Sequence, residues 1–263
     1  MLYTPRTLFR TLGHAAKTGA LLTGMFFAAP ISAQIMQVDY ASLTGTQFIS
    51  FATVAGGPPP GTNYDGILVA SGVAFGERFF GQTLTAVGDF DQLSGVPIGD
   101  LTLLAGAVNH NLASFQSPAG QVLSGIGTSG FPNNNAIGEG AVSLLFSSGQ
   151  SEFGFRLTGG NGGGANISFF SGNGALIQSF LLGNLPLNSL YGFSRTGQLA
   201  DIRGISIWNN DVTGIGLRDF RHDVISPVPE SETWAMMIVG FGAVGAAIRR
   251  RRHSTLPRKL CQS

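Results

Sequence analysis

Cysteine is nearly absent from this chain of 263 residues, and the one cysteine, Cys261, lies near the end. A single cysteine cannot form an intramolecular disulfide, and it leaves no cysteine pair to bind zinc. Histidine is also scarce, since only His110 and His222 fall between residues 34 and 226. We therefore expect no zinc site, and a domain that is stabilised by its core or by bound ions.

Lysine is absent between residues 34 and 226, where twelve acidic residues and six arginines give a formal charge of about −6. The positive charge lies in the two ends of the chain. Nucleic-acid-binding domains present a basic face, and anionic membrane surfaces attract basic segments. We therefore expect this part of the chain to bind neither nucleic acid nor an anionic membrane surface.

Amphipathic helical periodicity is also missing between residues 34 and 226, whereas glycine supplies 39 residues of the chain. Glycine weakens helices and favours turns. Short apolar or alternating segments recur between clusters of Gly, Pro and Asn, and they indicate about ten to twelve strands. The pattern predicts an all-β fold, a two-sheet antiparallel β-sandwich of the jelly-roll, lectin-like kind.

The second half of this region shows its strands most clearly. The segments 141–146 and 152–157 are predicted to form one hairpin, and 166–170 and 175–182 a second hairpin around a Gly-Asn-Gly turn. Phe153, Phe155 and Leu157 alternate with small or charged residues, so one face is expected in the core. The last expected strands are 191–194, 202–208 and 214–220.

Residues 1–33 have the pattern of a secretory signal peptide. A basic start is followed by an apolar stretch at 18–29, then by Pro30 and small residues. The apolar stretch is too short for a first transmembrane helix. We expect signal peptidase to cut between Ala33 and Gln34, and the chain to be exported.

The C-terminal tail joins a Pro-Glu segment, an uncharged apolar run and an arginine cluster. The run 234–248 has 15 residues, which as a helix would rise roughly 22 Å, against about 30 Å for a bilayer core. Arginine side chains that reach back to the membrane interface make up part of the difference. We expect a transmembrane helix whose arginines face the cytoplasm. These topology-determining residues are Arg249, Arg250, Arg251 and Arg252.

This tail resembles the PEP-CTERM protein-sorting signal, in the variant whose motif reads Pro-Glu-Pro-x-x-Trp-Ala. Ser231 stands where the second proline is usual. The resemblance implies a Gram-negative bacterium and an exosortase that recognises the motif and removes the tail. It also implies an association with exopolysaccharide and biofilm matrix. The motif comprises Val228, Pro229, Glu230, Trp234 and Ala235.

The signal peptide at one end of the sequence and the sorting tail at the other define the expected domain organisation. Residues 1–33 form the signal peptide, 34–226 the sandwich, and 227–263 the linker, motif, membrane helix and basic tail. Before processing, residues 234–248 would hold the protein in the inner membrane, and the mature protein would reach the outer surface or the extracellular matrix. The alternative is a plain C-terminal membrane anchor.

The segment 204–224 resembles the closing hairpin of lectin-like jelly rolls. Within it, Trp208 and Asn209 combine an aromatic face with an amide, as a carbohydrate site requires. The alternative is a core or interface role for Trp208.

The same segment holds Asp211, Asp219 and Asp223 close together in the sequence. Carboxylate oxygens are preferred ligands of Ca²⁺, so these residues are candidates for a structural calcium site. The alternative is that they are solvated turn and linker residues.

The resemblance of the tail implies a structural or adhesive protein of the cell surface or matrix, with polysaccharide binding, and the small number of candidate acids argues against an enzyme. The alternative is a secreted glycan hydrolase or lyase. Glycosidases use two carboxyl groups, and Glu139, flanked by glycines, or Glu77 would be the candidate acid.

Overall fold

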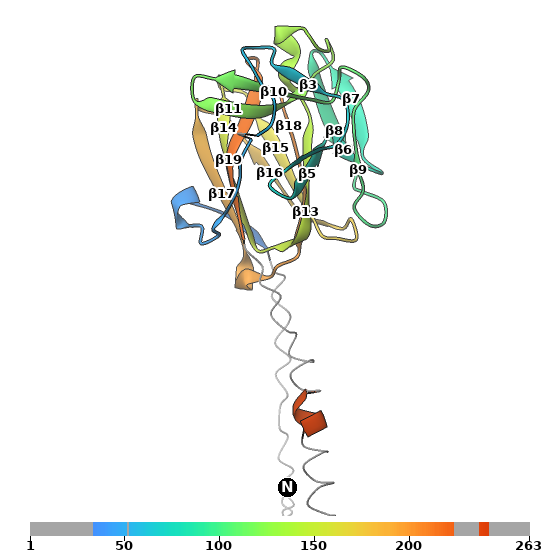
Figure 1. Ribbon diagram of the computed structural model, residues 1–263, viewed down its shortest axis with the longest axis vertical. Helices are drawn as coiled ribbons and strands as arrows, with labels where there is room; N and C mark the ends of the chain where they lie inside the picture. The colour runs from blue at the N-terminus through green and yellow to red at the C-terminus, as the bar shows by residue number, and fades with distance from the viewer. Residues whose placement is uncertain (1–33, 52, 224–236, 242–263) are drawn as a thin grey trace, which may run out of the picture. The chain divides into compact units, whose positions relative to one another are not determined.

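The computed structural model describes residues 34–51, 53–223 and 237–241. The first two ranges consist mainly of antiparallel strands (Figure 1). The all-β prediction is therefore confirmed. The strands form two large sheets and two small ones.

The two ends of the chain are described only in part. Residues 237–241 are helical, and in the described part of the chain no helix is long and apolar enough to cross a membrane. The signal peptide through Ala33, the motif from Val228 to Ala235 and the arginines 249–252 lie outside the described residues.

The first large sheet has nine strands. Seven of them follow one another in the order β1 (Ile35–Val38), β17 (Ser189–Arg195), β14 (Glu152–Gly159), β19 (Ile215–His222), β11 (Gly120–Ile126), β10 (Leu112–Ser117) and β3 (Thr62–Tyr64). Two short strands join them, β12 (Ile137–Gly140) beside β11 and β2 (Gln47–Ile49) beside β19.

The second large sheet has six strands. Their order is β16 (Leu176–Leu182), β15 (Ala165–Phe170), β18 (Ile202–Asn209), β13 (Val142–Gln150), β5 (Val73–Gly76) and β4 (Leu68–Ala70).

Short elements complete the described part. Two small sheets pair β6 (Arg78–Phe79) with β9 (Leu103–Leu104), and β7 (Thr83–Val87) with β8 (Phe90–Ser94). Three 3-10 helices are η1 (Tyr40–Ser42), η2 (Asn134–Ala136) and η3 (Thr196–Gln198).

Eight strands follow one another along the chain from β11 to β19 when the short β12 is left out. The first of them pairs with the last, the second with the next to last, and so on inward. The first strand, β11, pairs with the last, β19, and β13 pairs with β18. β14 pairs with β17, and β15 with β16. The pairs alternate between the two large sheets, so the chain passes from one sheet to the other at nearly every connection.

This arrangement confirms one predicted hairpin and overturns two others. β15 and β16 pair around the Gly-Asn-Gly turn, where Gly174 has a φ of +81°. β13 and β14 do not pair, because each lies in a different sheet, and the same holds for β18 and β19. Two consecutive strands with one apolar stripe each can pack those stripes against each other across a core, and this arrangement prevails here.

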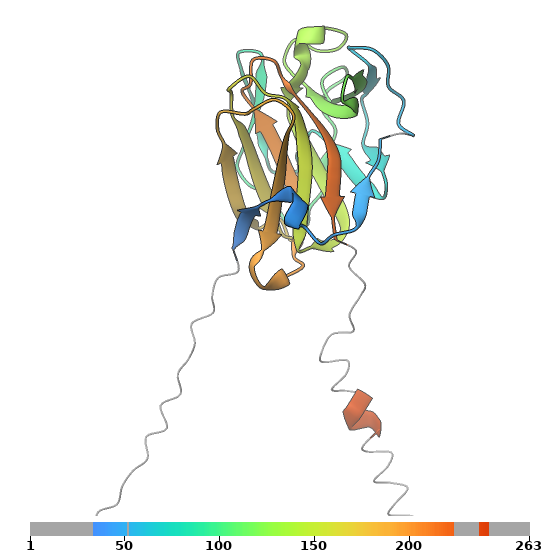
Figure 2. The same ribbon diagram turned by 90° about the vertical axis from the view of Figure 1, so that its left-hand side faces the viewer.

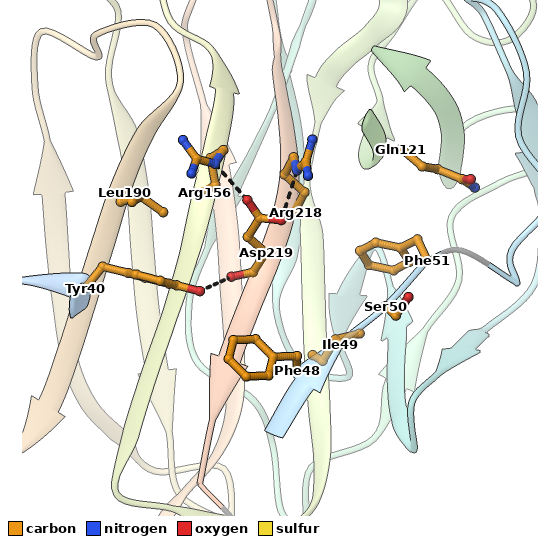
Figure 3. Close-up of a pocket in the computed structure, with 10 residues that line it drawn as sticks. All are labelled: Tyr40, Phe48, Ile49, Ser50, Phe51, Gln121, Arg156, Leu190, Arg218 and Asp219. Atoms are coloured by element: carbon orange, nitrogen blue, oxygen red, sulfur yellow. Dashed lines mark hydrogen bonds and ion pairs between the residues drawn. The ribbon is translucent and has the colours of Figure 1, made fainter. Parts of the chain in front are cut away.

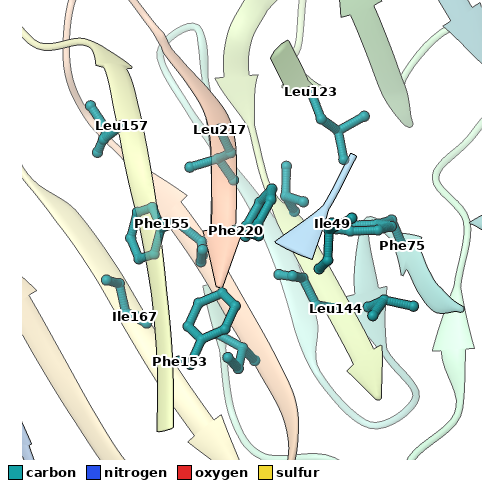
Figure 4. Close-up of a cluster of buried hydrophobic side chains, with 14 of the residues drawn as sticks. Ile49, Phe75, Leu123, Leu144, Phe153, Phe155, Leu157, Ile167, Leu217 and Phe220 are labelled. Atoms are coloured by element: carbon teal, nitrogen blue, oxygen red, sulfur yellow. The ribbon is translucent and has the colours of Figure 1, made fainter. Parts of the chain in front are cut away.

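The core between the two large sheets is rich in phenylalanine (Figure 4). Phe193 of β17 lies 5.1 Å, centroid to centroid, from Phe169 of β15 in the other sheet. Phe146 of β13 and Phe153 of β14 meet edge to face at 5.8 Å. Such ring pairs add to the large apolar area that each ring buries, so both sheets contribute to one core.

Candidate functional site

The N-terminal segment crosses the outer face of the nine-stranded sheet, from β1 at its edge to β2 beside β19 (Figure 2). Glycines make room for this crossing. A Cβ at Gly154 would come within 2.7 Å of the Tyr40 ring, and a Cβ at Gly192 within 3.0 Å of the Tyr40 backbone. These two glycines face each other across β14 and β17, so a glycine pair allows Tyr40 to lie on the sheet.

A cavity of about 420 Å³ opens between this segment and the sheet (Figure 3). β2 and the loop after it line one side, and η1, β11, β14, β17 and β19 contribute the remainder. The polar and aromatic residues that matter for its chemistry are Tyr40, Phe48, Gln121, Arg156, Arg218 and Asp219.

A β-bulge in β19 directs two charged side chains to the cavity. On β14, Gly154 pairs with Arg221 and Arg156 pairs with Arg218. Phe155, the single residue between them, therefore lies opposite two residues of β19, Asp219 and Phe220. Asp219 has a φ of +49°, a conformation that aspartate tolerates better than most residues. The extra residue lets Arg218 and Asp219 both line the cavity while Phe220 stays in the core.

Asp219 lies between two arginines (Figure 3). Its Oδ2 is 2.7 Å from Nε of Arg156, and its Oδ1 is 3.0 Å from Nε of Arg218. Burial alone would raise the pKa of Asp219, but hydrogen bonds and charge from the two arginines lower it below its usual value. The carboxylate is therefore ionised at neutral pH, and it offsets only one of the two positive charges.

One arginine donor in this group has no acceptor in the described part of the chain. Nη1 of Arg218 is buried and has no hydrogen-bond partner among the described residues, whereas Nη1 of Arg156 donates to the carbonyl of Asn188 at 3.1 Å. A buried charged donor without an acceptor is costly. An anionic group in the cavity would supply that acceptor.

A third arginine stacks on aromatic residues of the cavity wall. The guanidinium of Arg221 lies 5.7 Å from the ring centroid of Phe48 and 6.0 Å from that of Tyr40. Its Nε donates to the carbonyl of Gly45 at 2.6 Å, and the Tyr40 hydroxyl donates to the Asp219 carbonyl at 2.7 Å. Burial, followed by the Asp219 charge, raises the pKa of Tyr40, so its hydroxyl stays a neutral donor.

A second hollow of about 530 Å³ is formed by residues 56–59, Gln116 and Gln121. Gln121 lines both hollows, so they lie next to each other. Its Nε2 donates to the Ser114 hydroxyl at 2.9 Å and to the Val54 carbonyl, which holds the side chain in place. An extended ligand would therefore have surface to contact beyond the cavity itself.

Comparison of this chain with protein-family models, with curated proteins and with solved structures gave no match. The candidate function must therefore be argued from the site itself.

Trp208 and Asn209, the residues predicted to bind carbohydrate, do not line this cavity. Trp208 is half-buried on β18 and faces Asn166 of β15. Asn209 is fully buried, and its side chain donates to the Gly138 carbonyl at 2.8 Å and accepts from the Asp211 amide at 3.0 Å. Asn209 thus connects β18 to β12 and to the following turn.

The structure does not bring the three candidate calcium ligands together. Asp211 accepts hydrogen bonds from loop amides, Asp219 pairs with arginines, and Asp223 accepts from the amides of Ser151 and Glu152. Within the described ranges, no three His, Cys, Asp or Glu side chains are grouped so that they could hold a metal ion. Each carboxylate is occupied by different protein groups.

Glu77 and Glu139, the candidate acids of the enzyme alternative, are only 2% and 6% exposed. Neither lines the cavity at β14 and β19. They lie instead near Asp91, on the side of the molecule that carries the β7–β8 hairpin.

The arginines of the cavity were not among the predicted site residues. A signal existed, because Arg156 alternates with Phe155 and Leu157, and Arg218 follows Leu217, so both were expected to face away from the core. Their pairing depends on β14 lying beside β19, and the local sequence carries no mark of that neighbour.

Proposed function

We propose that this chain is an exported protein of the cell surface or extracellular matrix that binds an acidic polysaccharide in the β14–β19 cavity. The observation that supports it most directly is the group Arg156, Arg218 and Arg221 beside the rings of Tyr40 and Phe48. Arginine binds carboxylates through two parallel hydrogen bonds, and aromatic rings pack against sugar faces. A polymer of uronic acids presents both features to a site of this kind.

The distribution of charge favours an anionic ligand at this place. Residues 34–226 hold six arginines, and half of them lie on the adjacent strands β14 and β19. One carboxylate, Asp219, lies between Arg156 and Arg218, and it leaves net positive charge on an otherwise acidic region. A neutral glycan would gain no charge attraction from this concentration of guanidinium groups.

We further propose that the two large sheets form a jelly roll of the lectin-like kind. Jelly rolls divide eight strands between two sheets through two Greek keys. Rolling up one long hairpin of eight strands would produce the observed pairs, which are β11–β19, β13–β18, β14–β17 and β15–β16. Lectin domains are among the proteins with this architecture, and the site proposed here lies on the outer face of β14 and β19.

Export and sorting are proposed from the two ends of the sequence. The basic and apolar pattern of residues 1–33 supports cleavage by signal peptidase after Ala33. The motif Val228–Ala235, the uncharged run and the arginines 249–252 support recognition by an exosortase and placement in an exopolysaccharide-containing matrix.

Binding can be tested with alginate, a polymer of uronic acids, and dextran, a neutral polymer. We expect the protein to be retained on immobilised alginate and not on dextran, with retention falling as salt rises. Arg218→Gln should weaken binding roughly tenfold, about the loss of one charge-assisted hydrogen bond. Arg203→Gln, on the opposite sheet, is the matched control and should bind like wild type.

Circular dichroism would show that both variants are folded. Equal retention on the two polymers, or equal loss in the Arg203 and Arg218 variants, would contradict an acidic-polysaccharide site.

A further inference from the structure

Three carboxylates are almost fully buried in and beside the β7–β8 hairpin. Glu77 follows β5, Asp91 is on β8 and Glu139 is on β12, and they are 2%, 5% and 6% exposed. Acidic side chains are rarely buried to this degree unless they are paired. Glu77 has such a partner, because its carboxylate forms an ion pair with Arg78.

The β7–β8 hairpin lies beside the two large sheets (Figure 1), and β8 is the strand that contacts them. β8 contacts β18 and β12, and it buries Asp91 and Leu93, whereas β7 is largely exposed. The turn of the hairpin is held by Thr128, whose amide donates to the Asp89 carbonyl at 3.2 Å and whose hydroxyl donates to that of Gly88 at 3.1 Å.

Gly127 sets the distance between this turn and β12. A Cβ at that position would come within 2.5 Å of the Asp89 carbonyl oxygen and 2.7 Å of the Glu139 Cβ. The hairpin turn and Glu139 are therefore close neighbours, separated only by a glycine backbone.

Two of the three carboxylates accept no hydrogen bond from the described residues. Oε2 of Glu139 is buried and has no partner among the described residues. No described residue donates a hydrogen bond to the carboxylate of Asp91, which is near Glu77, His110 and Arg78. If both groups were ionised, the hairpin would press one unpaired negative charge against another.

The surroundings favour the protonated form of both groups. Burial, and then the charges of Asp89 and Asp91, raise the pKa of Glu139 to about 7. Burial and the Glu77 charge raise the pKa of Asp91 to about 6, against the opposing effect of His110 and Arg78.

Glu77 itself follows the same trend, because burial raises its pKa while Arg78 and His110 act to lower it. The acidic groups that face one another across the hairpin are therefore Glu77, Asp89, Asp91 and Glu139, with Arg78 and His110 as the nearby basic groups.

We propose that the β7–β8 hairpin is a proton-controlled flap, which docks on β12 and β18 when Glu139 and Asp91 are protonated and loosens when they ionise. Ionised carboxylates would repel each other and would be drawn toward water, and opening of the hairpin would let water reach both. In the described part of the chain no three acidic, histidine or cysteine side chains are arranged to hold a metal ion, so protons are the proposed counter-charge.

The direction of the pH dependence follows from the raised pKa values. Protonation stabilises the docked hairpin fully below the ordinary pKa values of 3.8 for Asp91 and 4.5 for Glu139. That contribution is lost as the pH rises through about 6 and about 7, the values in the docked state. Docking should therefore weaken between pH 5 and pH 8.

Hydrogen exchange of the amides in residues 83–94, measured on the purified full chain from pH 5.5 to 8.5, tests the flap. After correction for intrinsic exchange, wild-type protection should fall roughly tenfold between pH 6 and pH 8, as one group with a docked pKa near 7 requires. Glu139→Gln keeps the side-chain shape and removes the titration, so its protection should change much less. Asp100→Asn, an exposed control, should retain the wild-type profile.

Asp89→Asn is a second variant that changes an exposed residue, so it should fold even if the Glu139 variant does not. Asp89→Asn removes a charge that raises the pKa of Glu139 in the docked state. With that pKa lowered, the fall in protection should end at a lower pH and be smaller than in wild type.

 

The measurement that tests the flap most directly is the hydrogen-exchange protection that residues 83–94 retain at pH 8. With one repulsive charge removed, the Asp89→Asn hairpin should keep more protection at pH 8 than wild type, while the two proteins match at pH 5.5, where Glu139 is protonated in both. Wild-type protection that does not change between pH 6 and pH 8, or an Asp89→Asn profile identical to it, would overturn the flap. So would calcium that restores the protection of pH 6 at pH 8, because a cation would then replace the proton.

Discussion

At the residue scale, the clearest determinant of local structure is Asp211. This fully buried carboxylate accepts hydrogen bonds from the amides of Asn161 and Gly163 at 2.6 and 3.0 Å, and from the amide and hydroxyl of Thr213 at 3.1 and 2.6 Å. Burial alone would raise the pKa of Asp211, but these hydrogen bonds together lower it below the ordinary 3.8. Asp211 therefore connects the glycine-rich loop after β14 to the turn before β19.

Asp211→Asn should lower the free energy of unfolding at pH 7 by roughly 2–3 kcal/mol, because charge-assisted hydrogen bonds to two loops are lost. Since the pKa of Asp211 is lowered by folding, its contribution is present above pH 3.8 and disappears as the pH falls below that value. Urea unfolding at pH 7 and pH 3 measures both effects. The variant should approach wild type at pH 3, and a difference of the same size at both pH values would refute this role.

Single residues also show where an alternating pattern predicts burial and where it does not. Phe153, Phe155 and Leu157 are fully buried, as their alternation predicted. Glu152, on the other face of β14, was expected in water, yet it is only 2% exposed because its carboxylate accepts hydrogen bonds from Gly45 and Thr44. The N-terminal segment covers it, and nothing in the sequence around Glu152 indicates that cover.

At the scale of the element, the strands after residue 140 lie close to where they were predicted, but not all their partners do. The turn at Gly174 identifies the β15–β16 hairpin because it brings the two strands together locally. β13 and β14 have the same kind of pattern and are connected through Ser151, yet they enter different sheets. An alternating strand has the same sequence pattern whether its neighbour pairs beside it or packs across the core.

The pairing of β11 with β12 depends on close backbone contact at glycines. A Cβ at Gly140 would come within 2.3 Å of the Ile126 amide nitrogen, so Gly140→Ala forces one strand away from the other. We expect a loss of about 1–3 kcal/mol in the free energy of unfolding.

Gly66→Ala is the matched control for this prediction, because a Cβ there would meet no atom within 4 Å. Its stability should stay within roughly 0.5 kcal/mol of wild type. Thermal or urea unfolding distinguishes the two variants, and equal stabilities would show that β11 and β12 accommodate the methyl group.

At the scale of the whole molecule, folding converts a region of net negative charge into one with a local positive site. Arg156 and Arg218 are far apart in the sequence but become partners across β14 and β19. Arg221, further along β19, stacks on Phe48 and Tyr40 of the crossing N-terminal segment. Net charge therefore does not describe each part of the surface, because the local distribution of charge decides what a surface binds.

The proposed route of export makes a prediction about the mature chain. If an exosortase removes the tail, intact-mass analysis of secreted material should show a chain that begins at Gln34 and ends between about residues 229 and 234, the motif that the resemblance identifies. A chain truncated after Ser226 should no longer follow this route. Secreted protein that still extends to Ser263 would contradict processing, and retention in the inner membrane would favour the plain anchor.

Local pattern was enough to assign the all-β class, most strands after residue 140 and the buried phenylalanine stripe, because alternation reflects only which face of a strand meets the core. It was not enough to place β14 beside β19 or Tyr40 across both, and so it did not reveal the arginine cavity. Those neighbours depend on which apolar stripes pack together across the core, and that choice is made by contacts between segments far apart in the chain.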